Sequence, residues 1–159
     1  MLETLLLLLT AASWCYWLVA CWWVRDFFRA RQEPDSGFAP PASILKPVKG
    51  LDFEAYQNFA SFCQQDYPDY ELLFGVADPA DPVVPVVERL QRDFPQRSIR
   101  LVVAPIIGAN RKVSILHCLA ALACHEVLVV SDSDMRATPD YLRRVAAPLA
   151  DERIGLVTC

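Results

Sequence analysis

The stretch Val127-Leu128-Val129-Val130-Ser131-Asp132-Ser133-Asp134 is an apolar run that ends in two aspartates two positions apart. An apolar run of this length, without polar alternation, is typical of a strand that is buried on both faces of a parallel sheet. In such sheets, ligands bind in the crevice beyond the carboxyl ends of the strands. The stretch therefore predicts a buried strand whose last residues, Asp132 and Asp134, belong to a binding site.

Strand and helix patterns alternate along the rest of the chain beyond residue 41. We expect strands at 42–45, 70–77, 99–103, 127–131 and 154–158, and helices at 53–64, 82–94, 114–124 and 140–147. This alternation favours βαβ units, in which a parallel sheet carries helices on both faces. The predicted fold class is therefore α/β.

The first segment has the composition of a membrane anchor. From Thr4 to Val24 there is no charged residue, and a helix of this length, at about 1.5 Å per residue, spans roughly 30 Å of hydrocarbon. Trp22 and Trp23 close the segment and Arg25 follows, whereas Glu3 precedes it. The positive-inside bias then places the domain that follows in the cytoplasm.

We therefore divide the chain into a transmembrane anchor at 1–24, a juxtamembrane linker at 25–41 and a domain at 42–159. The linker is indicated by its Pro and Gly residues. A cleaved leader is the alternative, because Leu18–Cys21 is similar to a bacterial lipoprotein cleavage box. The apolar run continues past Cys21 and no basic residue precedes it, so the anchor is favoured.

Charge and cysteine content argue against a nucleic-acid-binding protein and against a cysteine-based zinc protein. The 15 Lys and Arg residues are outnumbered by 19 Asp and Glu, and the net charge is −4. A nucleic-acid binder usually presents a basic face, so nucleic acid is not expected as a partner. The six cysteines form no C-x-x-C pair, and no Cys/His cluster has zinc spacing. We therefore expect free thiols in a reducing compartment.

The two aspartates of the opening stretch are candidate metal ligands. Two carboxylate ligands leave coordination positions of the metal open, and this suits Mg²⁺ or Mn²⁺ that bridges a diphosphate. The alternative is that Asp132 and Asp134 are turn residues, since aspartate is common in turns.

Two other strand ends carry polar residues. Asp78 follows the strand at 70–77, and its carboxylate can accept hydrogen bonds from a ribose or a base, or can begin a turn. Asn110 and Lys112 stand at the start of the helix expected at 114–124. This helix start can meet an anionic ligand, or Asn110 can be a plain N-cap.

Five motifs, in this order, resemble the ceramide glucosyltransferase-like family, which is of the glycosyltransferase family 2/21 type. Within the family, the chain is most similar to bacterial hopanoid-biosynthesis glycosyltransferases. The resemblance covers the chain from about Ala42 to Cys159. The motifs are residues 43–52, 58–68, 76–81, 108–114 and 130–134.

The resemblance implies a GT-A fold, of which this chain is the Rossmann-like nucleotide-binding half. It implies an inverting transfer of a hexose, glucose or N-acetylglucosamine, from a UDP-sugar to the hydroxyl of a ceramide- or hopanoid-type lipid at a membrane, which for a bacterial protein is the inner membrane. It places Asp78 at the uridine, and Asp132 and Asp134 at the diphosphate and its Mg²⁺ or Mn²⁺. The other residues it implies in nucleotide-sugar binding are Pro47, Lys49, Asn110 and Lys112.

The chain departs from the family pattern in two ways. Ile115 stands where the pattern has asparagine. The family's catalytic-base aspartate and its Gln/Arg-x-x-Arg-Trp motif are absent, so the chain is expected to be the donor-binding, N-terminal part of a longer enzyme and inactive alone. Two alternatives stay open: a haloacid-dehalogenase-like phosphohydrolase with Asp132 as its nucleophile, and a non-catalytic, membrane-tethered nucleotide-binding module.

Overall fold

The computed structural model describes residues 1–30 and 37–158. The chain divides into two compact units, Met1–Ser36 and Gly37–Cys159. Residues 31–36 of the linker expected at 25–41 lie outside the described residues, as does Cys159.

The first unit is one helix, α1, which runs from Leu2 to Ala30. Its segment Leu2–Phe27 is long and apolar enough to cross a membrane. The hydroxyls of Thr10 and Ser13 donate to the carbonyls of the residues four positions earlier, at 2.8 and 3.0 Å. These two hydroxyls are therefore hydrogen-bonded within the helix, as polar groups in hydrocarbon require.

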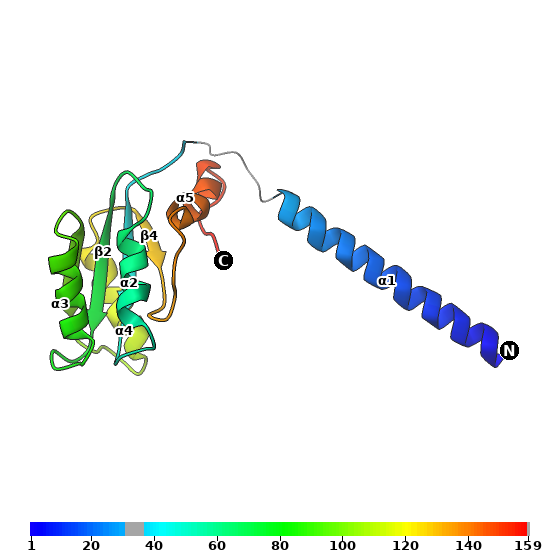
Figure 1. Cartoon of the computed structure of the whole chain (residues 1–159), viewed down its shortest axis with the longest axis horizontal. Coiled ribbons are helices and arrows are strands. Elements are labelled where there is room, and N and C mark those ends of the chain that lie inside the picture. Colours follow the sequence, from blue (N-terminus) through cyan, green and yellow to red (C-terminus); the bar gives the residue numbers. More distant parts are fainter. Residues whose placement is uncertain (31–36, 159) are drawn as a thin grey trace. The chain divides into compact units, whose positions relative to one another are not determined.

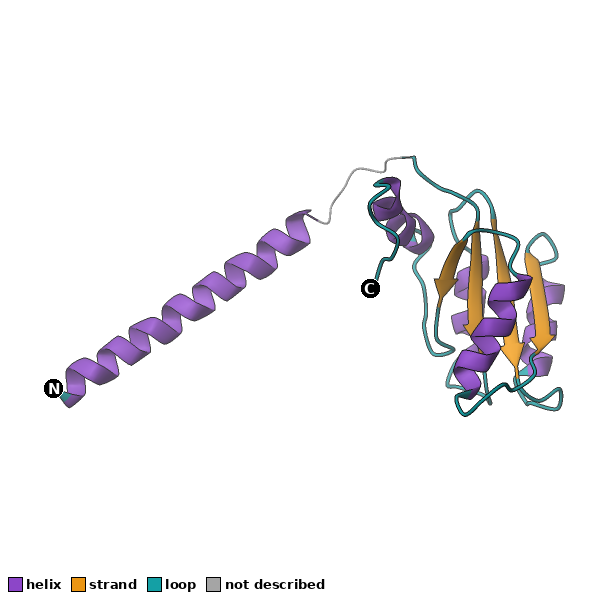
Figure 2. Cartoon of the chain, turned by 180° about the vertical axis from the view of Figure 1, so that it is seen from behind, coloured by secondary structure: helices purple, strands orange, loops and turns teal. Residues whose placement is uncertain are grey.

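The second unit is built on a parallel sheet (Figures 1 and 2). Its strands are ordered β3-β2-β1-β4, and every neighbouring pair is parallel. The α/β fold class predicted from the sequence is confirmed. The strands are β1 (Ala42–Pro47), β2 (Tyr70–Val76), β3 (Ser98–Val103) and β4 (Val127–Val130). The helices are α2 (Ala55–Cys63), α3 (Val84–Asp93), α4 (Arg111–Leu122) and α5 (Tyr141–Ala146), followed by a short 3₁₀ turn, η1 (Ala147–Ala150).

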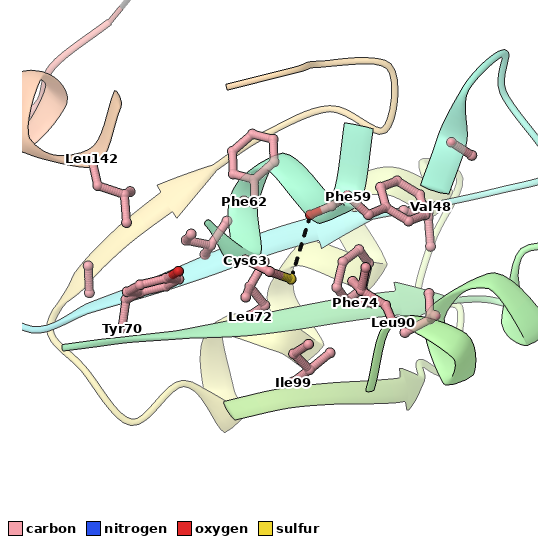
Figure 3. Packing of buried hydrophobic residues seen from close by; sticks show 14 of the residues in the cluster. Val48, Phe59, Phe62, Cys63, Tyr70, Leu72, Phe74, Leu90, Ile99 and Leu142 are labelled. Atoms are coloured by element: carbon pink, nitrogen blue, oxygen red, sulfur yellow. Dashed lines mark hydrogen bonds between the residues drawn. The ribbon is translucent and has the colours of Figure 1, made fainter. Parts of the chain in front are cut away.

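The two faces of the sheet carry separate hydrophobic clusters. The larger packs Ile44, Leu72 and Phe74 of β1 and β2 against side chains of α2 and α3, among them Phe59 and Leu90 (Figure 3). On the other face, the alternating residues of the same strands pack against α4. Both faces of β1 and β2 are buried, as the lack of polar alternation predicts.

Cys63 belongs to the larger cluster. Its thiol donates to the carbonyl of Phe59, and Sγ lies 3.7 Å from that oxygen (Figure 3). Burial raises the pKa of the thiol to about 12. The cysteines in the described part of the chain are free, as expected from their spacing.

Two sequence expectations are wrong. The strand predicted at 127–131 is not buried on both faces: Leu128 and Val130 are 43% and 53% exposed, because α4 packs over β1 and β2 on that side of the sheet. The segment 154–158, predicted as a strand, forms no strand in the described residues. A β-strand requires a neighbour for its backbone hydrogen bonds, and this apolar segment is paired with none of the four strands.

Candidate functional site

A pocket of about 470 Å³ lies at the carboxyl ends of the central strands. It is bordered by the loop after β1, the end of β2, the first turn of α4 and the segment after β4. The structure brings five of the predicted site residues to its wall: Pro47, Lys49, Lys112, Asp132 and Asp134. Asp52, Arg111 and Ser133 also line it, and the sequence had assigned no role to Asp52 or Ser133.

The two aspartates reach the pocket because the chain turns directly after β4. The amide of Ser131 still donates to the carbonyl of Leu45 at 3.1 Å, next to the β1–β4 ladder. The amide of Met135 then donates to the carbonyl of Asp132 at 3.5 Å, which closes a turn over residues 132–135. This turn interrupts the alternation of the strand, so that both carboxylates border the same pocket.

Helix α4 brings positive charge to the same place. Asn110 caps the helix, and its side-chain oxygen accepts from the amide of Val113 at 3.2 Å. In the first turn, Nζ of Lys112 lies 2.5 Å from Oδ1 of Asp132. The helix N-terminus and the lysine therefore place donors for an anion beside the aspartates.

Lys46 is buried beneath this site. It belongs to β1, and Nζ donates to Oγ of Ser131 at 3.0 Å and to the carbonyl of Asp132 at 2.8 Å. Burial lowers the pKa of the amine to about 7, although the charges of Asp132 and Asp134 oppose this shift. Lys46 belongs to the motif at residues 43–52, but its burial beneath the pocket, and not in the pocket wall, was not predicted from the sequence.

The loop after β1 is held by hydrogen bonds to two neighbouring segments. The amide of Gly50 donates to both carboxylate oxygens of Asp81, at 2.9 and 3.1 Å. Gly50 has a φ of 70°, in the left-handed region that glycine adopts without strain. The hydroxyl of Ser133 donates to the carboxylate of Asp52, which ties this loop to the aspartate turn.

Two predicted site residues do not line the pocket. Asp78 follows β2 and accepts the amide of Ala80 at 2.8 Å, so it begins a turn. Asn110 serves as the N-cap of α4. Both therefore have the structural roles that the sequence left open as alternatives, and their part in nucleotide binding stays a prediction.

The chemistry of the pocket fits a hard divalent cation that is shared with a ligand. Within residues 1–30 and 37–158, no three His, Cys, Asp or Glu side chains form a complete protein-only metal site. Asp132 and Asp134 border the pocket from one short turn. Mg²⁺ is commonly bound by one or two carboxylates together with phosphate oxygens and water. Asp132 and Asp134 therefore match that donor set.

The parallel sheet with helices on both faces has the fold of GT-A glycosyltransferases. A mannosyltransferase from Pyrobaculum calidifontis, solved with GDP-Man and Mn²⁺, has this fold with a TM-score of 0.68 and 22% identity, over 100% of this chain and 47% of that one. TarS of S. aureus, solved with UDP-GlcNAc, matches with a TM-score of 0.55 and 17% identity, over 71% of this chain and 32% of that one.

The chain belongs to glycosyl transferase family 21, which matches residues 5–159. It is 31% identical to ceramide glucosyltransferase 3 of Caenorhabditis elegans over 121 residues, which are 75% of this chain and 26% of that protein. It is 30% identical to ceramide glucosyltransferase of Candida albicans over 126 residues, covering 70% of this chain and 23% of that protein. The chain thus spans about a quarter of the length of these relatives. Family membership favours the glycosyltransferase interpretation over a phosphohydrolase.

Proposed function

We propose that this chain is the donor-binding part of a membrane-bound inverting glycosyltransferase. The enzyme transfers a hexose, glucose or N-acetylglucosamine, from a UDP-sugar to the hydroxyl of a ceramide- or hopanoid-type lipid. Family membership supports this proposal. The observation that carries it is the gathering of Asp132, Asp134 and Lys112 at one strand-end pocket.

The acidic and basic residues of the pocket have different roles in donor binding. Asp132 and Asp134 hold Mg²⁺ or Mn²⁺, which when bound supplies positive charge to the diphosphate leaving group. Lys112 and Lys49 add positive charge beside the phosphates, and the N-terminus of α4 adds backbone donors. Asp78, at the end of β2, accepts hydrogen bonds from the uridine.

Transfer to the lipid requires a base within hydrogen-bond reach of the acceptor hydroxyl. The family resemblance implies that the base and the acceptor contacts belong to the parts of the relatives that this chain does not span. The chain alone therefore binds the donor without turnover. Helix α1 anchors it in the membrane where the acceptor resides, a bacterial inner membrane, and Arg25 keeps the catalytic domain in the cytoplasm.

The proposal is tested by calorimetric titration of UDP into the full chain in detergent, with Mn²⁺, with Mg²⁺ or with EDTA. We expect divalent metal to strengthen UDP binding about tenfold or more in the wild type and to have no effect in Asp134→Ala. Asp69→Ala is the matched control, because this exposed aspartate precedes β2 at the opposite edge of the sheet. The proposal would be contradicted if the affinity for UDP did not depend on divalent metal in the wild type and in both variants.

A further inference from the structure

Lys46 is a fully buried lysine in the strand that runs beneath the pocket. Its ammonium group lies 3.8 Å from the ring centroid of Phe62 and 5.9 Å from that of Phe59. Figure 3 shows both rings on the α2 side of the sheet, within the larger hydrophobic cluster. Burying an amine in such surroundings costs free energy unless its hydrogen bonds are made. A side chain of methionine would fill the same space without that cost.

The hydrogen bonds of Lys46 point to the aspartate turn. The ladder between β1 and β4 ends at the pair Leu45 and Val130. One residue beyond it, Nζ of Lys46 donates to Oγ of Ser131 at 3.0 Å and to the carbonyl of Asp132 at 2.8 Å. The side chain therefore adds to the link between the two strands at the point where their backbone ladder ends.

We infer that Lys46 is a positioning residue for the metal and diphosphate site. Its amine fixes the peptide of Asp132 from beneath, and this fixes the direction in which the carboxylates of the turn face the pocket. The inference rests on the proposed function, since it concerns the same two aspartates. Lys46 does not line the pocket; it acts through the hydroxyl of Ser131 and the backbone carbonyl of Asp132.

Two variants test this role in the full chain in detergent. Lys46→Met removes both hydrogen bonds and keeps an apolar chain of similar length against Phe62. Ser43→Ala is the matched control. Ser43 lies three positions before Lys46 and is also fully buried in β1, but its hydroxyl donates to Oε1 of Glu71, at 2.6 Å, and not to the aspartate turn. Mn²⁺ binding in the presence of UDP is measured by electron paramagnetic resonance, UDP binding in EDTA by calorimetry, and thermal unfolding by circular dichroism.

We expect Lys46→Met to lower the affinity for Mn²⁺ about tenfold while UDP binding in EDTA stays at the wild-type value. Ser43→Ala should lower the midpoint of thermal unfolding and leave both affinities unchanged. Lys46→Gln, which keeps a donor on a shorter chain, should lie between the wild type and Lys46→Met. If Lys46→Met does not fold, Lys46→Gln is compared with the wild type in its place.

The outcomes separate this inference from the function on which it rests. A wild-type chain that binds no Mn²⁺ with UDP contradicts the proposed function. A wild type that binds Mn²⁺, together with folded Lys46 variants that bind it equally well, overturns only the positioning role. That role is also overturned if Mn²⁺ affinity falls in proportion to thermal stability across all variants, Ser43→Ala included, because Lys46 is then a residue of the core.

Discussion

Lys112 and Asp132 form an ion pair at the pocket, with Nζ 2.5 Å from Oδ1. The lysine comes from the first turn of α4 and the aspartate from the turn after β4. Their side chains are 53% and 56% exposed, and pairs as exposed as this contribute about 0–1 kcal/mol to stability. The lysine therefore neutralises a proposed metal ligand and can be displaced from it at small cost.

This pairing predicts opposite effects of Lys112→Met on two ligands. Mn²⁺ alone should bind about threefold more tightly, because it no longer competes with the lysine for Asp132. UDP in the presence of Mn²⁺ should bind several-fold more weakly, because one positive charge beside the phosphates is lost. Paramagnetic resonance without nucleotide and calorimetry with UDP measure the two affinities.

Arg89→Met is the control for this variant. It breaks another exposed ion pair, between Arg89 and Asp93 on α3, where Nε lies 3.3 Å from Oδ2. It should change neither affinity. If Lys112→Met weakened the binding of Mn²⁺ alone, competition between lysine and metal would be contradicted.

Asp81 supports the loop after β1, and its removal should loosen that loop. Its carboxylate accepts the amides of Gly50 and Val83. Asp81→Ala leaves these donors without a partner, and we expect a loss of about 1–3 kcal/mol in the free energy of unfolding. Hydrogen exchange at residues 49–52 should accelerate and UDP should bind more weakly.

The control for that variant is Asp151→Ala. Asp151 also accepts a backbone amide two positions later, that of Arg153 at 3.0 Å, in a segment that does not line the pocket. Faster hydrogen exchange confined to residues 49–52 in Asp81→Ala supports the assignment. Equal exchange in both variants and the wild type counts against it.

The sequence predicted the elements that depend on local patterns. The apolar runs of β1 and β2 and the apolar stripe of α3, with Val87 and Leu90 buried, follow the burial that their spacing indicates. The apolar segment at 154–158 has an equally good strand pattern but forms no strand. Strand formation depends on a partner that is distant in the chain, and one segment does not specify that partner.

The site was predictable where it followed from topology alone. Since all four strands are parallel, their carboxyl ends share an edge, which brings residues after β1 and β4 to one pocket. The supporting contacts were not predictable, because they join side chains that are far apart in sequence. Lys46 and Ser131 are 85 positions apart, and Gly50 and Asp81 are 31 positions apart.

Gly75 allows α4 to approach the sheet, so Gly75→Ala should displace that helix. A Cβ at this position would lie 2.3 Å from Cγ2 of Ile115 and 3.1 Å from Cδ1 of Leu119. Such overpacking costs about 1–3 kcal/mol. We expect that loss in chemical unfolding, together with weaker UDP binding, since α4 carries Lys112.

A double-mutant cycle with Ile115→Ala separates this clash from other effects of the added methyl group. Ile115→Ala removes the side-chain atom that the new Cβ would meet. Gly75→Ala should therefore cost less in that background, with a coupling of about 1 kcal/mol or more. Equal costs in the two backgrounds would show that contact with Ile115 does not set the spacing of α4.

The low pKa of Lys46 predicts that the stability of the Gly37–Cys159 unit rises with pH. Burial lowers the pKa of the folded state to about 7, whereas the ordinary value is 10.5. Between these values the unfolded chain binds a proton that the folded chain has released, so the free energy of unfolding increases as pH rises. For one proton the slope approaches about 1.4 kcal/mol per pH unit. Urea unfolding at pH 7, 8 and 9, followed by circular dichroism, measures it.

Lys46→Met isolates this contribution, because it removes the amine and leaves the other titrating groups in place. The raised pKa of Cys63 has the opposite effect as pH rises through the ordinary thiol value of 9.0: the unfolded thiol loses its proton first, and stability falls. The series therefore ends at pH 9, and Cys63 contributes equally to both proteins. We expect the wild type to gain stability relative to Lys46→Met from pH 7 to pH 9. Parallel pH profiles for the two proteins would mean that the amine keeps its ordinary pKa, and that the folded domain admits water to Lys46.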